Sequence, residues 1–197
     1  MSTLQNLYYF DAGDGPKLLQ YNEKYLGVLA GGGGGTYETD PQVWNMTNDT
    51  TPSPLVATYS SRFNATYSGY RAFNGDWFNW PDDVWISGIT TAAWVGIDLG
   101  VGNEIYAWKF GLAINAISGG PDYAPKDFKF LGSNNGSDWD TLYEDAAEPA
   151  WSGDTIRTYE YAGVPDTAYR YYRYDCLECQ TGPYVSIAEM FVYKFIP

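Results

Sequence analysis

The sequence of this 197-residue chain predicts an all-β domain, a β-sandwich or jelly roll that follows a short N-terminal extension. Short segments with the two-residue period of a strand recur roughly every 10 to 15 residues, with turn signals between them. No long segment has the period of an amphipathic helix. The length suits one sandwich core with an appendage, and the 19 Tyr and 8 Trp suit both sandwich cores and hydrated binding surfaces.

The clearest expected element is a β-hairpin over residues 125–143, PKDFKFLGSNNGSDWDTLY. Phe128 and Phe130 alternate with polar residues, as in a strand that buries one face. The small and polar run over residues 132–138 excludes a helix, and its Asn-Gly dipeptide favours a tight reversal of the chain. A second strand is expected to begin near Trp139.

The same reasoning predicts strands on both sides of this hairpin. In chain order they cover residues 56–59, 93–99, 104–112, 155–161, 170–177 and 185–195. The first two are separated by a long aromatic loop over residues 70–87, YRAFNGDWFNWPDDVWIS, which contains an Asn-Gly and a Pro-Asp turn signal. Short strands with no long helix are typical of a sandwich or jelly roll.

Residues 1–35 differ from the rest and are expected to form an N-terminal anchor with a glycine-rich tether, before a sandwich over residues 36–197. Apolar residues at helical spacing predict one short helix over residues 16–29, which Gly27 weakens. The five consecutive glycines that end the segment suit a flexible tether. A segment of this size does not fold alone, so we expect it to dock onto something larger. The alternative is an extra strand or helix that lies on the sandwich itself.

The formal charge of −13, from 24 acidic and 11 basic residues, limits the partners. Proteins that bind nucleic acids or anionic membrane surfaces display clustered Lys and Arg, so we expect neither partner. Neutral ligands or a cation suit this charge better. No apolar run reaches the length of a membrane span, and the N-terminus lacks the basic and apolar regions of a secretory signal peptide.

Catalysis and zinc binding have few candidate residues in this chain. It contains no His, so Ser-His-Asp and Cys-His arrangements are absent, and no spacing of Asp and Glu selects a glycosidase pair. The two cysteines, Cys176 and Cys179, lack the two further ligands that zinc needs. They lie in a strand-like run, where residues three apart point to opposite faces, so the favoured interpretation is two reduced, partly buried thiols. We do not expect an enzyme.

Six segments, in this order along the chain, carry a family resemblance. They are AFNG at 72–75, VWIS at 84–87, AWVGIDLG at 93–100, PKDFKFLGSNNGSDWDTL at 125–142, YRYYRYDC at 169–176 and VSIAEMFVY at 185–193. Together they resemble the discoidin family, also called the coagulation factor V/VIII type C domains, over about residues 45–195. The resemblance implies a galactose-binding-like β-sandwich that binds ligands and does no chemistry. Many members of the family are carbohydrate-binding modules.

Residues 46–61, MTNDTTPSPLVATYSS, further resemble discoidin-like domains of bacteriophage tail and fibre proteins. This resemblance implies a virion protein that adheres to host surface glycans from a tail, fibre or capsid appendage. Release by lysis of the host needs no signal peptide; otherwise the protein is expected in the cytoplasm of the producing cell. Residues 1–35 would then contact other virion proteins. The alternative function is a structural decoration or adaptor protein of the virion that binds no sugar.

In this family, ligands meet loops at one end of the sandwich, where sugar-binding members use aromatic and polar side chains. The resemblance implies a site around the aromatic loop, with the expected ligand-binding residues Trp77, Phe78, Trp80, Tyr67, Tyr70, Arg170 and Tyr184. The loops over residues 115–122 and 180–184 are expected to flank the same end, and Trp85 falls at the family's core tryptophan. Exposed indoles suit a sugar ring, but subunit contact, as in a homo-oligomer, and simple loop packing remain open. Arg170 either hydrogen-bonds hydroxyls or stacks on rings.

Many family members also hold one structural Ca²⁺ beneath these loops. The matching positions are the backbone oxygen of Ala72 and the side chains of Asn74, Asp76 and Glu189. The family's usual Asp is replaced by Asn74 in this chain, and calcium prefers several hard oxygen ligands, with carboxylates for affinity. The lost charge weakens the site but leaves four candidate carboxylates, Asp76, Asp82, Asp83 and Glu189. The sequence therefore leaves both a bound and an absent structural calcium ion open.

Overall fold

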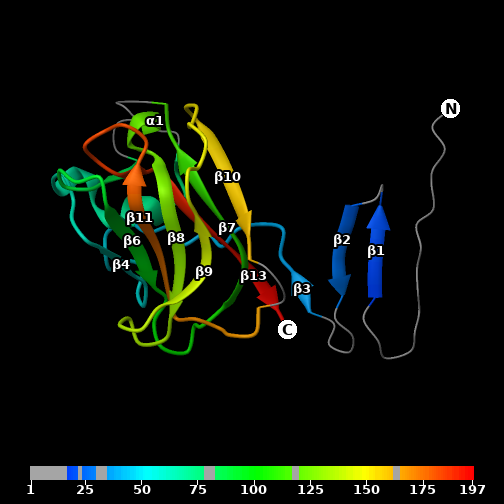
Figure 1. Ribbon diagram of the computed structural model, residues 1–197. Coiled ribbons are helices and arrows are strands. Elements are labelled where there is room, and N and C mark those ends of the chain that lie inside the picture. The colour runs from blue at the N-terminus through cyan, green and yellow to red at the C-terminus, as the bar shows by residue number, and fades with distance from the viewer. Residues whose placement is uncertain (1–16, 22–23, 30–34, 78–82, 117–119, 162–164) are drawn as a thin grey trace. The chain divides into compact units, whose positions relative to one another are not determined.

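The computed structural model of the chain describes residues 17–21, 24–29, 35–77, 83–116, 120–161 and 165–197 (Figure 1). The chain divides into two compact units. One consists of residues 1–36 together with residues 196–197, and the other of residues 37–195.

The described part of the N-terminal unit is an antiparallel hairpin of β1 (Lys17–Tyr21) and β2 (Lys24–Leu29). The predicted helix over residues 16–29 is therefore wrong. An isolated helix of this length is marginal in water, and Gly27 weakens it further. Tyr21 pairs with Lys24 across a two-residue connection, which is the commonest hairpin length. Most of the glycine run, residues 31–34, lies outside the described residues.

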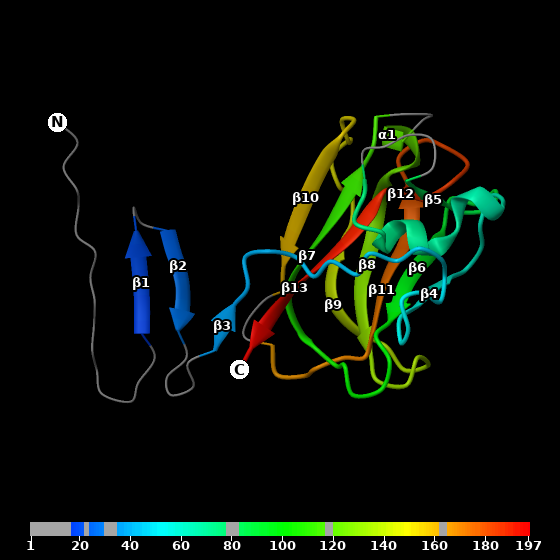
Figure 2. The same cartoon turned by 180° about the vertical axis from the view of Figure 1, so that it is seen from behind.

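The larger unit is a β-sandwich of two antiparallel sheets, seen from two opposite sides in Figures 1 and 2. One sheet has five strands in the order β4-β6-β11-β8-β9, and the other has four in the order β10-β7-β13-β3. The strands of the sandwich are β3 (Thr36–Tyr37), β4 (Val56–Tyr59), β5 (Trp85–Ile86), β6 (Ala93–Asp98), β7 (Tyr106–Ile114), β8 (Pro125–Ser133), β9 (Asp140–Asp145), β10 (Thr155–Glu160), β11 (Tyr171–Cys179), β12 (Ser186–Ile187) and β13 (Glu189–Ile196). β5 and β12 form a separate short pair.

The predicted fold class is confirmed, and so is the predicted hairpin, because β8 and β9 pair antiparallel across the polar turn. The strand expected over residues 185–195 is divided in two. β12 pairs with β5, whereas β13 pairs with β7 from Glu189 onward. Between them the Ala188 N–H donates to the Ala113 carbonyl, so the chain passes from one pairing to the other at this residue.

The core lies between the two sheets and is rich in stacked aromatic rings. Phe110 of β7 stacks on Phe130 of β8 at 4.0 Å, and Phe130 stacks on Tyr172 of β11 at 5.6 Å. These residues alternate with outward-facing neighbours, as the period of two requires. Trp85 is fully buried, which confirms its predicted place in the core.

The four-stranded sheet also buries part of its outer face. Buried residues of β13, β7 and the β5–β12 pair form a second apolar cluster there, with Tyr67, Trp77, Trp108 and Tyr184 packed against it. Within it Trp77 meets the ring of Phe191 edge to face at 5.1 Å. Two 3₁₀ turns, η1 (Ala65–Tyr67) and η2 (Gly69–Phe73), and the short helix α1 (Gly120–Tyr123) complete the described elements. Among the described residues no helix is long and apolar enough to span a membrane.

Cys176 and Cys179 of β11 are buried as free thiols, the interpretation that the sequence favoured. The pairing of β11 with β8 shifts register between them. Burial raises the pKa of the Cys176 thiol far above its ordinary value, so this group stays protonated and unreactive at neutral pH.

Candidate functional site

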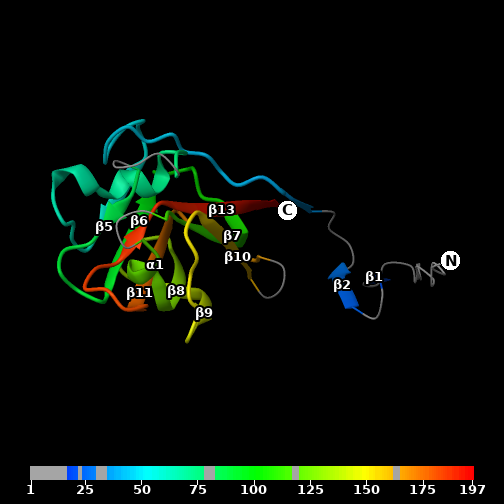
Figure 3. The same cartoon turned by 90° about the horizontal axis from the view of Figure 1, so that it is seen from above.

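The two ends of the sandwich carry different loops. We call one the α1 end: it holds α1, the starts of β6 and β8 and the ends of β7 and β11 (Figure 1). The opposite end holds the ends of β6 and β8 and the starts of β7 and β11. Viewed from above, α1 lies close to the end of β11 (Figure 3). Segments over residues 60–68, 120–124 and 180–185 meet at the α1 end.

Four aromatic rings from these three loops converge at the α1 end, and we call them the aromatic cluster: Phe63, Tyr67, Tyr123 and Tyr184. The ring of Tyr184 meets Phe63 edge to face at 5.4 Å and Tyr123 edge to face at 5.2 Å. The ring centres of Phe63 and Tyr67 lie 6.0 Å apart. Half of the Phe63 surface is exposed, at 50 %, so the cluster presents apolar area to solvent.

Backbone hydrogen bonds join two of these loops to each other and tie the third to β5. The Thr181 and Gly182 N–H groups both donate to the Asp122 carbonyl at 3.0 Å. A Cβ atom on Gly182 would lie 2.0 Å from the ring of Tyr123, so only glycine permits this close approach. The Phe63 N–H donates to the Ile86 carbonyl, which ties the first loop to β5.

The cluster combines apolar faces with polar groups that remain available. The phenol oxygens of Tyr67, Tyr123 and Tyr184 have no hydrogen-bond partner within the described parts of the chain. Tyr rings of this kind offer a hydrophobic body and a polar handle at the same place. Such a surface suits a ligand that has both C–H faces and hydroxyl groups.

The structure brings together only part of the predicted ligand-binding set. Tyr67 and Tyr184 lie in the aromatic cluster. Tyr70, in η2, is half-buried against the core, with the Arg71 guanidinium 5.1 Å from its ring centre. Trp77 is half-buried on the outer face of the four-stranded sheet, where it takes part in loop packing. The predicted residues Phe78 and Trp80 lie outside the described residues.

Arg170 lies at the opposite end and does not join the other predicted residues. Its Nε and Nη2 atoms each donate to a carboxylate oxygen of Asp98 at 2.6 Å. Its guanidinium also lies 4.7 Å from the ring centre of Tyr171. Stacking, one of the two alternatives for Arg170, is therefore what the structure shows.

Two members of the cluster, Phe63 and Tyr123, are absent from the predicted set. The sequence did place the loops over residues 115–122 and 180–184 at one end, and Tyr123 directly follows the first of them. Phe63 stands in a Ser- and Asn-rich segment without a local signal of its own. Its role depends on the loop that carries Tyr184, which lies more than a hundred residues further along the chain.

Three of the predicted calcium ligands, Ala72, Asn74 and Asp76, come from the chain around Gly75, whose N–H contacts the carboxylate of the fourth, Glu189. Ala72 and Glu189 are buried, and both carboxylate oxygens of Glu189 lie within 3.3 Å of the Gly75 N–H. Burial raises the pKa of Glu189 to about 9; backbone hydrogen bonds from Gly75 and Asn74 act against this shift, and the nearby Asp76 adds to it. A cation beside such a carboxylate would hold it ionised.

The donor chemistry at this place fits a calcium ion. Asn74 Oδ1 accepts the Asp76 N–H at 2.9 Å, which shapes the turn around Gly75 at φ +80°. Carboxylate, amide and backbone oxygens are the ligands that calcium uses. In the described ranges no three His, Cys, Asp or Glu side chains form a metal-binding group. The fit therefore depends on Glu189 and Asp76 with neutral oxygens from Ala72 and Asn74.

Comparison with known proteins places the fold. The family model "F5/8 type C domain" matches residues 56–190. None of the curated proteins matches this chain. Among solved structures, a family 32 carbohydrate-binding module of Clostridium perfringens NanJ, in complex with galactose, is similar with a TM-score of 0.56 and 14 % identity, over 71 % of this chain and 93 % of that chain.

Two further solved structures are similar over a comparable share of this chain. Chitosan-binding module 2 of a chitosanase/glucanase from Paenibacillus sp. IK-5, in complex with chitotriose, gives a TM-score of 0.55 and 19 % identity, over 70 % of this chain and 95 % of that chain. A fucolectin from striped bass, Morone saxatilis, gives a TM-score of 0.56 and 15 % identity, over 71 % of this chain and 46 % of that chain. These likenesses confirm the galactose-binding-like β-sandwich. The chain belongs to the F5/8 type C domain family.

Proposed function

We propose that this chain is a glycan-binding module without catalytic activity, and that it binds through the aromatic cluster at the α1 end. The observation that supports this most strongly is the convergence of Phe63, Tyr67, Tyr123 and Tyr184 from three loops, with three phenol groups available. The family and its sugar-binding structural neighbours, with galactose, chitotriose or Lewis b, support the same reading. A pyranose ring offers the C–H face and the hydroxyls that this cluster suits.

The charge of the chain narrows the class of glycan. With 24 acidic and 11 basic residues, the protein repels polyanions over a distance of about one Debye length. We therefore expect neutral or amino-sugar glycans to bind, and sulfated or uronic-acid polymers to bind poorly.

A glycan array tests the site. The full chain is compared with Tyr184→Ala, which removes the central ring of the cluster, and with Tyr171→Ala, a half-buried Tyr at the opposite end, as the matched control. Loss of one aromatic contact weakens binding roughly 3- to 10-fold. Tyr184→Ala is expected to show this loss and Tyr171→Ala to bind like the unaltered chain. Equal binding by all three proteins would show that the glycan binds outside the aromatic cluster.

The biological setting of the module is a finer proposal. We propose a virion-associated adhesin of a bacteriophage tail, fibre or capsid appendage, held on the particle by residues 1–35. The sequence resemblance of residues 46–61 supports this setting. Deletion of residues 1–35 should then prevent incorporation into particles. If particles retain the truncated chain while the array shows no glycan, a structural decoration protein that contacts other subunits through the sandwich becomes the better account.

We also propose a structural calcium ion at Glu189, with Asp76, Asn74 and the Ala72 carbonyl as its ligands. When bound, the ion would supply the positive charge that this buried carboxylate lacks. An ion that binds only the folded chain raises its stability, by about 2.7 kcal/mol at a hundredfold excess over the dissociation constant.

Thermal unfolding with and without a chelator measures this contribution. A chelator is expected to lower the melting temperature of the unaltered chain by several degrees. Glu189→Gln should remove the difference, while Glu178→Gln, an exposed carboxylate paired with Lys126, should preserve it. If neither calcium nor the chelator changes the melting temperature of the unaltered chain, the site binds no ion, and the replacement of the family's Asp by Asn74 accounts for the loss.

A further inference from the structure

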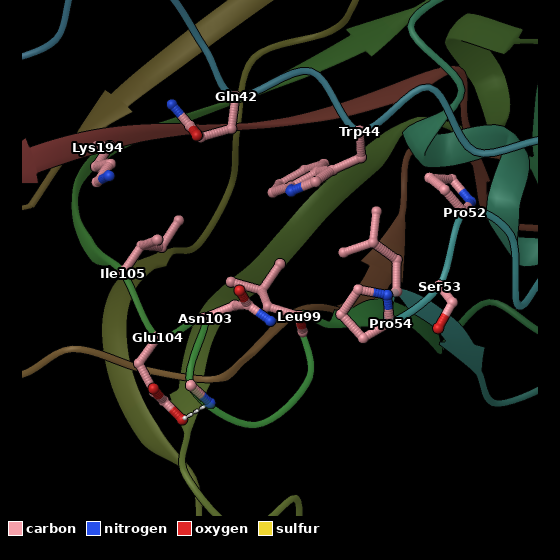
Figure 4. A pocket seen from close by; sticks show the side chains of 12 residues that line it. Gln42, Trp44, Pro52, Ser53, Pro54, Leu99, Asn103, Glu104, Ile105 and Lys194 are labelled. Carbon is pink, nitrogen blue, oxygen red and sulfur yellow. Dashed lines mark hydrogen bonds between the residues drawn. The ribbon is translucent and has the colours of Figure 1, made fainter.

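A pocket of about 510 Å³ opens at the opposite end of the sandwich, far from the aromatic cluster. Residues from three segments line it, with Lys194 of β13 at its edge: Gln42 and Trp44, residues 52–55, and Leu99 with residues 102–105 (Figure 4). β11 runs between the two ends with nine residues, a length of roughly 30 Å. The pocket and the aromatic cluster are therefore separate sites.

The pocket has an aromatic wall and an apolar floor. The indole of Trp44 reaches into it from one side, and Ile105 and Glu104 line the other (Figure 4). Trp44 is half-buried, because its ring meets Phe73 of the core edge to face at 5.7 Å. Leu99 contributes to the floor. The indole is thus held in place by the core while part of its surface remains open to the pocket.

Polar groups around the indole keep free hydrogen-bonding capacity. Asn103 Nδ2 donates to the Leu99 carbonyl at 3.0 Å, which leaves its amide oxygen available. Glu104 Oε1 accepts a hydrogen bond from the Gly102 N–H at 3.1 Å, which leaves the second carboxylate oxygen available to a ligand. Neither the Glu104 carboxylate nor the Lys194 ammonium has an ion pair with another described residue. The Glu104 carboxylate, an acceptor, and the Lys194 ammonium, a donor, therefore line the same pocket without forming an ion pair with each other.

From this geometry we infer that the Trp44 pocket is a second glycan-binding site, which takes one neutral or amino-sugar unit. Its volume lies in the range of small-ligand sites, about 300–1,000 Å³. A pyranose places a C–H face on an indole and hydroxyls within reach of amide, carboxylate and ammonium groups. Two sites at opposite ends make each chain bivalent, so that one chain bridges two glycan strands and does not bind one surface twice.

The test separates the two sites by mutation on the same glycan array, which includes galactose and chitotriose. In a Tyr184→Ala background the aromatic cluster is weakened, so the pocket contributes a larger share of the remaining binding. Trp44→Ala removes the aromatic wall of the pocket. Glu104→Gln removes one charge and keeps the shape of the side chain, so this variant tests the pocket if Trp44→Ala fails to fold. Val101→Ala, on the same loop but 80 % exposed and outside the pocket lining, is the control.

We expect the binding that remains in Tyr184→Ala to fall at least fivefold on adding Trp44→Ala or Glu104→Gln, and to persist with Val101→Ala. Binding that disappears completely in Tyr184→Ala, or that neither pocket variant changes, overturns the second site and leaves the first intact. If Trp44→Ala alone abolishes all binding, the pocket stands and the proposed cluster site fails. If the unaltered chain binds no glycan on the array, both proposals are wrong.

Discussion

Asp98, at the end of β6, accepts both hydrogen bonds of the Arg170 guanidinium and a third from the Gly100 N–H at 2.8 Å. Its side chain is only 13 % exposed. Burial alone would raise the pKa of this carboxyl, but the hydrogen bonds from Arg170 and Gly100 outweigh it and hold the pKa below its ordinary value. The ion pair therefore joins β6 to the start of β11 most strongly when Asp98 is ionised.

The sign of the pH dependence follows from this lowered pKa. A carboxyl that is more acidic in the folded chain stabilises it above the ordinary value, near pH 4, and loses this contribution as the pH falls through the folded-state value. Asp98→Asn is expected to lower the free energy of unfolding at pH 7 by about 1–2 kcal/mol. The difference from the unaltered chain should shrink toward pH 2–3.

Urea denaturation at both pH values measures this effect. Glu144→Gln is the matched control, because Glu144 pairs with Lys129 at 3.1 Å but is 55 % exposed. An exposed pair contributes close to nothing, so we expect little change at either pH. A loss in Asp98→Asn that is the same at pH 7 and pH 3 would contradict an electrostatic origin.

On the outer face of the five-stranded sheet, Arg173 of β11 lies between two indoles. Its guanidinium is 5.0 Å from the ring centre of Trp94, on β6, and 4.6 Å from that of Trp139, which precedes β9. Its Nη2 atom donates to Asp175 at 2.7 Å. Because β11 is central in the sheet, this stack connects it with elements on both sides.

Arg173→Lys keeps the charge but loses the planar group that stacks on both rings. Two cation–π contacts of about 0.5–1 kcal/mol each predict a loss of about 1–2 kcal/mol in the free energy of unfolding, measured by chemical denaturation. Arg62→Lys is the control, since the Arg62 guanidinium lies 6.0 Å from the centre of a single ring, that of Tyr59, and its side chain is 41 % exposed. Equal effects of the two substitutions would show that stacking does not hold this face.

Most strands of the sandwich were predictable because their side chains alternate between core and solvent. Phe128 and Phe130 show this in β8, where the polar turn also fixed the hairpin. The β1–β2 hairpin was missed because its apolar residues fit a helical spacing as well as an alternating one. In so short a segment the period alone does not separate the two.

At the scale of the whole molecule, the candidate site arises from convergence that local patterns do not encode. Phe63, Tyr123 and Tyr184 meet only because β4, β7 and β11 bring their loops to one end of the sandwich. The resemblance to the family directed attention to that end and found Tyr67 and Tyr184. Arg170 was misplaced because the nine residues of β11 carry it to the opposite end. The Trp44 pocket likewise joins three segments that are distant in sequence.

Glycan binding at the α1 end is measurable residue by residue with NMR. The ¹⁵N-labelled chain is titrated with the glycan that gives the strongest array signal, and the backbone amide shifts are mapped. We expect the amide signals of residues 60–68, 120–124 and 180–185 to shift, with a second group around Trp44 if the pocket also binds. Saturation with that glycan while the amides of the α1 end stay unmoved would contradict glycan binding at this end.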